Sequence, residues 1–67
     1  MILKIYKLLK GIDKSITLKQ VCNIIIWFQE SDPIFNDTVE IYNRIHDAKP
    51  SKRIVENLKE FSKNYFD

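Results

Sequence analysis

The chain is poor in the residues that make tight turns and cross-links, with one glycine, two prolines and one cysteine in 67 residues. So little glycine and proline leaves few positions for β-turns, which argues against a β-meander or barrel. The single cysteine, Cys22, excludes an internal disulfide. Its position on an apolar helix face predicts a small, unreactive core residue, and a reduced, cytoplasmic setting is the expectation.

The chain also has no long apolar run. Its longest, from Ile24 to Phe28, is far shorter than the roughly 20 residues that cross a bilayer. Lysines interrupt the N-terminal segment at Lys4, Lys7 and Lys10, so we expect no secretion signal there. The first segment has the form of an interfacial helix, but we expect it to cover the core, so a membrane partner is not expected.

Motifs that carry chemistry are missing as well. His46 is the only histidine and has no partner at ligand spacing, so we expect neither a metal site nor a cofactor. No serine follows a nucleophile-elbow pattern. The acids Glu56 and Glu60 fall on a convex helix face that could not enclose a substrate. We therefore predict a protein without enzymatic activity.

The residues that are present are those of a folded domain. Apolar residues make up 45% of the chain, charged residues 30% and aromatic residues 12%, a composition that predicts one globular domain over residues 1–67. A domain of this length buries only about 60% of its unfolded surface. Its stability margin is small, so a bound protein or a second copy would help to hold it folded.

The clearest local signal starts a helix at Leu18. Thr17 as N-cap with Gln20 three residues later forms a capping box, and Ile16 and Val21 can pack together as a hydrophobic staple. The helix continues to about Glu30 and is apolar around more than half of its circumference, which predicts the central helix of a bundle.

A second amphipathic helix is predicted over residues 2–12. Ile2, Ile5, Leu9 and Ile12 share one face at 100° per residue, opposite the lysines. Gly11 suits a left-handed C-terminal cap. The alternative is a short strand over residues 2–9, because the segment is rich in β-branched residues.

Two further helices complete the expected bundle. The third begins either at Asp32-Pro33 or at an Asp37 cap, and it ends before Lys49, because the residue before a proline disfavours helical geometry. The fourth runs from a cap at Ser51 to about residue 66. Its expected inner face is made by Ile54, Leu58, Phe61 and Tyr65, with Val55 alongside. Short connections favour antiparallel neighbours, so the predicted fold is all-α, a compact bundle of three to four short antiparallel helices.

Charge is distributed unevenly along the chain. Residues 1–19 carry a net charge of +4, residues 20–48 carry −4 and residues 49–67 carry +2. One interpretation is a basic surface for DNA or RNA; the other is a set of ordinary solvated helix faces, which the scarcity of arginine favours. The nucleic-acid alternative would use the basic faces of the first and last helices, namely Lys4, Lys7, Lys10, Lys49, Lys52, Arg53, Lys59 and Lys63.

Trp27 stands out because it falls in the polar sector of the central helix. A tryptophan on such a face either anchors a protein partner or is covered by a neighbouring helix. The candidate protein-binding site is therefore Trp27 with Gln20, Asn23 and Glu30. We expect a small non-enzymatic intracellular binding protein, a regulator or inhibitor acting by protein–protein contact or as a homodimer. Many isoleucines and lysines with a single alanine suggest an AT-rich coding sequence, which would fit a phage or plasmid accessory protein.

Overall fold

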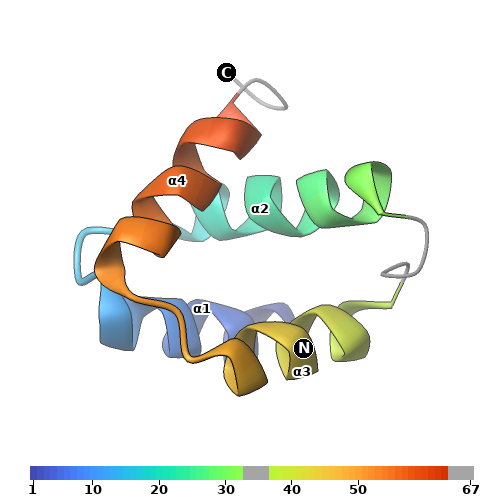
Figure 1. The fold of residues 1–67 in the computed structure, drawn as a ribbon, viewed down its shortest axis with the longest axis horizontal. Coiled ribbons are helices and arrows are strands. Elements are labelled where there is room, and N and C mark those ends of the chain that lie inside the picture. The colour runs from blue at the N-terminus through green and yellow to red at the C-terminus, as the bar shows by residue number, and fades with distance from the viewer. Residues whose placement is uncertain (33–36, 64–67) are drawn as a thin grey trace.

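The structure is a computed structural model that describes residues 1–32 and 37–63. Within these residues four helices follow one another: α1 (Ile2–Ile12), α2 (Leu18–Ser31), α3 (Thr38–Ala48) and α4 (Lys52–Ser62). Figure 1 shows them in a compact arrangement, and the described residues contain no strand. The predicted all-α bundle of short helices is confirmed, and the first segment is a helix and not the alternative strand.

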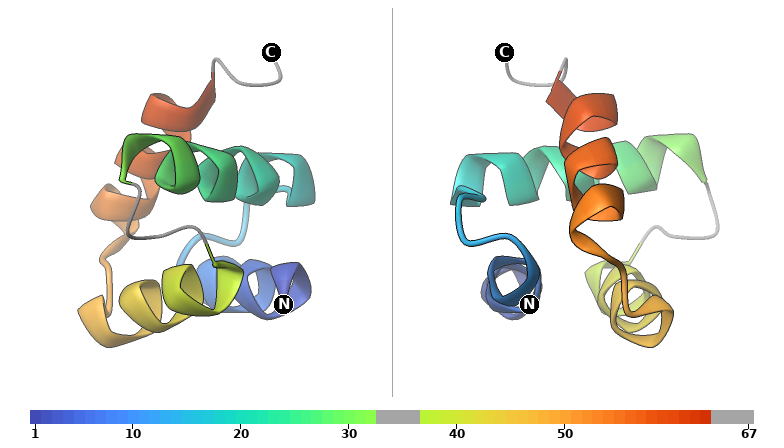
Figure 2. Two further views of the ribbon diagram at one scale, coloured as in Figure 1. Left: turned by 90° about the vertical axis from the view of Figure 1, so that its right-hand side faces the viewer. Right: turned by 60° about the vertical axis from the view of Figure 1, so that its left-hand side comes forward.

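The helices form two levels. α1 and α3 lie beside each other on one side of the molecule, and α2 lies across them on the other side. In the right-hand view of Figure 2, α1 and α3 point toward the viewer, α2 runs across the view and α4 rises from the α3 end to pack on α2. The short connections between helices predicted antiparallel neighbours, but helices that follow each other in the chain cross at steep angles. α2 contacts each of the other three helices and is central, as predicted.

The start of α2 follows the predicted capping box. The backbone N–H of Gln20 donates to Oγ1 of Thr17 at 3.2 Å, and the backbone N–H of Thr17 donates to Oε1 of Gln20 at 2.9 Å. Ile16 and Val21 are both buried, as the hydrophobic staple requires. The cap thus fixes where the chain leaves the α1–α2 turn and enters the central helix.

α3 begins at the second of its two possible starts. Asp37 is its N-cap and accepts a hydrogen bond from the backbone N–H of Val39 at 2.9 Å. Asp32 is instead the C-cap of α2, and its backbone N–H donates to the carbonyl of Phe28. The alternative start at Asp32-Pro33 involves residues 33–36, which lie outside the described residues.

A sharp turn separates α3 from α4. α3 ends at Ala48, as the proline predicted, and Lys49 takes a left-handed backbone conformation with φ 46°. Pro50 is buried and Ser51 caps α4, accepting from the backbone N–H of Ile54 at 3.4 Å. The chain therefore turns from the lower level toward α2 within three residues.

Two local predictions are wrong. Gly11 lies inside α1, which ends one residue later with Asp13 in an extended conformation, so Gly11 is not a left-handed cap. Of the expected inner face of α4, Ile54 and Phe61 are exposed, while the buried side chains are Val55, Leu58 and Ser62. Compared with the expected orientation, α4 is rotated about its own axis, because it packs across α2 and does not lie alongside α3. The predicted continuation of α4 to residue 66 lies outside the described residues.

The core lies between the two levels and under α4. It is made almost entirely of branched aliphatic side chains: Ile5, Leu9, Ile16, Val21, Ile24, Ile25, Ile41, Ile45, Val55 and Leu58. Three of these, Val21, Ile24 and Ile25, come from α2, which agrees with its central position.

An ion pair ties the α1–α2 turn to α4. Nζ of Lys59 donates to Oδ2 of Asp13 at 2.7 Å, and Asp13 is almost fully buried. The other carboxylate oxygen, Oδ1, accepts from the backbone N–H and the hydroxyl of Ser15. These hydrogen bonds, the one from Lys59 foremost, hold the pKa of the Asp13 carboxyl well below its usual range. Asp13 is therefore charged and fully partnered at neutral pH.

The described residues lack two features that would point to a particular function. No helix in residues 1–32 and 37–63 is long and apolar enough to cross a membrane. The same residues contain no group of three or more His, Cys, Asp or Glu side chains that could hold a metal ion. His46 is exposed and stacks on Tyr42 with the ring centroids 5.7 Å apart.

Candidate docking groove

A groove lies between α3 and α4, which do not pack against each other. α3 and α4 follow each other in the chain, yet within the described residues they make no close backbone contact, because α4 rises away from the lower level. The space between them is an open hollow of about 110 Å³. It is lined by Phe28, Arg44, Ile45, Ala48, Pro50, Ile54 and Leu58.

Three helices and one turn position the lining side chains. Phe28 comes from the last part of α2, Ile45 and Ala48 from the C-terminal half of α3, and Ile54 from the first turn of α4. Pro50 lies in the turn between α3 and α4 and lines the end of the groove. Six of the seven lining residues are apolar, and Arg44 is the charged one.

An aromatic cluster extends the apolar surface beyond the groove. The rings of Trp27 and Phe28 meet edge to face with centroids 5.1 Å apart, and Trp27 stacks on Phe61 of α4 at 5.7 Å. Phe61 is 61% exposed and Ile54 is 49% exposed. Phe28 lines the groove and also contacts Trp27, so the apolar surface continues from the groove into the cluster.

The residues expected to surround Trp27 do not all reach the surface. α4 packs over the sector of α2 that appeared polar in the sequence, and Trp27 itself is half-buried against Phe61. Asn23 is only 2% exposed, and its Oδ1 has no hydrogen-bond partner in the structure. Gln20 is occupied by the capping box, whereas Glu30 is exposed. Of the four, Trp27 joins the apolar surface, and Asn23 is not available to a partner.

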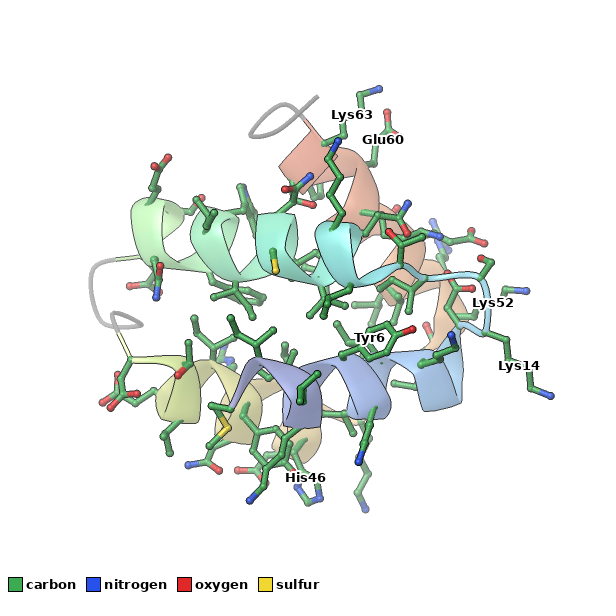
Figure 3. All side chains as sticks on the ribbon, turned by 180° about the vertical axis from the view of Figure 1, so that it is seen from behind. Tyr6, Lys14, His46, Lys52, Glu60 and Lys63 are labelled. Atoms are coloured by element: carbon green, nitrogen blue, oxygen red, sulfur yellow. The ribbon has the colours of Figure 1, made fainter. Side chains whose placement is uncertain are left out.

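The basic residues of the nucleic-acid alternative do not gather on one face. In Figure 3, Lys52 and Lys63 project from opposite ends of α4, and His46 lies at the edge of the molecule opposite Lys63. Lys59 is held by Asp13, Lys63 pairs with Glu60 at 2.9 Å, and Lys10 donates to the hydroxyl of Tyr6 at 2.8 Å. The remaining members are exposed on two different helices and the turn: Lys4, Lys7, Lys49, Lys52 and Arg53.

Sequence reasoning placed two residues of this surface in the core. Ile54 and Phe61 were assigned to the buried face of the fourth helix, although they line the groove and the cluster. The sequence did contain a sign that some of these residues would be exposed. The fourth helix carries two adjacent apolar rows, one with Ile54 and Phe61 and one with Val55 and Leu58. A single helix–helix contact in so small a bundle buries only one of them.

The fold and this groove define the protein at the level of a small all-α bundle with an open apolar surface. No protein-family model, no curated protein and no solved structure matches the chain.

Proposed function

We propose that this protein is a small regulator or inhibitor that acts by protein–protein contact and docks its partner in the groove between α3 and α4. The observation that carries the proposal is the set of apolar side chains that runs from Ile54 and Phe28 in the groove to Trp27 and Phe61 beside it. Single exposed apolar residues are ordinary on protein surfaces, but a contiguous patch marks an interaction site. Aromatic side chains at its edge fit this role, because they supply contact area at low entropic cost.

The size of the groove favours a protein over a metabolite. Pockets for small ligands usually enclose roughly 300–1,000 Å³ and bury most of the ligand. A hollow of about 110 Å³ that is open on one side accepts one or two side chains of a partner. Its lining is almost entirely apolar, which suits the apolar side chains of a protein partner.

Selection of ligands from a phage-displayed random peptide library tests the proposal. We expect the recovered peptides to bind the wild type and to bind an Ile54→Asn variant at least about tenfold more weakly, the effect of losing one buried apolar anchor. Leu3→Asn is the matched control, since Leu3 is 62% exposed on α1 and lies outside the groove. Trp27 is the only tryptophan, so its emission reports binding at this surface directly.

If the peptides bind Ile54→Asn and Leu3→Asn as tightly as they bind the wild type, the groove is not the docking site. A fluorescent DNA duplex of random sequence provides the second arm of the test. Binding of the duplex that falls steeply with salt and survives Ile54→Asn would favour the nucleic-acid alternative instead.

A further inference from the structure

A projecting aromatic ring and an apolar hollow lie on the same side of α4. Ile54 and Phe61 are seven residues apart, which is close to two full helical turns, so both face one side of the helix. Ile54 lines the open hollow of about 110 Å³, whereas Phe61 is 61% exposed and lies further along the helix against Trp27. One face of the molecule therefore offers both a ring that can be buried and a hollow that can receive one.

We infer that the groove is occupied by a second copy of this chain, with the two α4 helices packed antiparallel so that Phe61 of each copy enters the hollow of the other. The inference rests on the proposed function and names the partner at the same site. A twofold contact uses the same patch on both copies, so the patch must be complementary to itself. A face that carries both a ring and a hollow meets this condition.

The spacing of residues along α4 sets the register of the contact. Asn57 lies between Ile54 and Phe61 in the chain and is exposed, as they are. With the twofold axis beside Asn57, Phe61 of one copy lies opposite Ile54 of the other, at the hollow, and the same contact repeats across the axis. A cavity of about 150 Å³ holds a whole benzene molecule. The smaller, open hollow suits the exposed edge of a ring that stays stacked on Trp27.

The charges around this face are compatible with a second copy. Residues 28–63 include all seven lining side chains and carry seven acidic and six basic side chains. This near balance selects neither a strongly acidic nor a strongly basic partner, and it leaves little like-charge repulsion between two copies. Arg53 and Glu60 are exposed toward opposite ends of α4, so an antiparallel copy brings each near the other. Glu60 also pairs with Lys63 of its own helix, and such exposed pairs add little affinity.

The area of the contact predicts a weak, reversible dimer. An aromatic side chain presents roughly 150–250 Å², so the exposed part of Phe61 offers on the order of 100 Å² on each copy. Two rings and the two hollows that receive them come to several hundred Å², which is below the roughly 1,200 Å² of the smallest stable interfaces. We therefore expect the copies to associate in the micromolar range or above.

Sedimentation equilibrium of the intact chain tests the inference. We expect the average mass to rise from that of one chain toward that of two as the concentration rises through the micromolar range. Phe61→Asn should raise the dissociation constant at least about tenfold, because each copy loses its buried apolar anchor. Leu3→Asn is the matched control, since Leu3 is equally exposed on α1, and it should leave the dissociation constant unchanged.

Cysteine cross-linking tests the antiparallel register separately, in a Cys22→Ala background with diamide as the oxidant. A disulfide needs two Cα atoms within about 7 Å. Asn57→Cys places its two copies beside the axis and should give a disulfide-linked dimer. Arg53→Cys places its two copies more than about 10 Å apart along the helices, so this variant should stay uncross-linked.

The outcomes separate this inference from the proposal beneath it. If the wild type stays monomeric into the millimolar range while selected peptides bind in a way that depends on Ile54, the groove stands and the second copy is refuted. A dimer that Phe61→Asn leaves as tight as the wild type would place the contact elsewhere and would overturn the inference. Cross-linking of Arg53→Cys without cross-linking of Asn57→Cys would overturn the antiparallel arrangement.

Discussion

Asp13 is the residue on which the closure of the α1–α2 turn depends. Its carboxylate is buried, accepts two hydrogen bonds from Ser15 and pairs with Lys59, which lies 46 residues further along the chain. A buried carboxylate that loses its cation is left with an uncompensated charge, which is strongly unfavourable. The pair thus fixes the relative position of α4 and the turn.

This arrangement predicts a pH dependence of stability. The folded-state pKa of Asp13 is depressed, so the unfolded chain takes up the proton first as the pH falls. The stabilisation is complete above the ordinary carboxyl pKa of about 3.9 and is lost progressively below it. Urea unfolding between neutral and acidic pH should show this loss in the wild type.

The variant Asp13→Asn should be less stable than the wild type at neutral pH, and the difference should narrow in acid. Asp47→Asn serves as the control because Asp47 is an exposed carboxylate, and its effect should be small throughout. A constant difference between Asp13→Asn and the wild type at every pH would contradict the assignment.

Asn23 shows how a residue on an apparently polar face can be misjudged. In the sequence it belongs with Gln20 and Glu30, yet it is buried and its Oδ1 has no hydrogen-bond partner. A buried, unsatisfied amide oxygen typically costs about 1–3 kcal/mol. No pattern within one helix reveals which side a later helix will cover, because that depends on the crossing angle.

At the scale of the elements, the helix ends are the part of the fold that the sequence specifies best. The capping box at Thr17, the caps at Asp37 and Ser51 and the stop before Pro50 are all local signals, and all were predictable. The orientation of a helix about its own axis was not predictable. Ile54 and Phe61 were expected in the core but are exposed, because α4 packs across α2. The groove was missed for the same reason.

The capping box gives a prediction for α2. Thr17→Ala removes the side-chain acceptor for the backbone N–H of Gln20 and should lower the free energy of unfolding by about 1 kcal/mol. Thr17→Ser keeps the hydroxyl and should be close to the wild type. Equal stability of the alanine and serine variants in urea titrations would show that the cap contributes nothing.

At the scale of the whole molecule, one small aliphatic core supports two crossing levels of helices. The Cα radius of gyration is 10.6 Å, close to the roughly 11 Å expected for a chain of this length. Because α2 packs on the other three described helices and supplies Val21, Ile24 and Ile25 to the core, a charge on its inner face would disturb the entire fold.

The substitution Ile25→Asp should unfold the protein. Ile25 is 4% exposed in the middle of α2, and an unpaired carboxylate there costs more than so small a domain can offset. Leu3→Asp makes the same chemical change at an exposed site on α1 and should leave the helical circular dichroism signal intact. A folded Ile25→Asp protein with an unchanged melting temperature would mean that α2 is not the centre of the bundle.

The groove is assembled from α2, α3 and α4, and no one helix or hairpin carries it alone. An unfolded chain therefore has no binding site, and any ligand that fills the groove draws the population toward the native state by mass action. At a free ligand concentration of 100 times the dissociation constant this linkage adds about 2.7 kcal/mol, a large share of what a chain of this size can hold by itself. The abundance of such a protein in a cell would then follow the abundance of its partner.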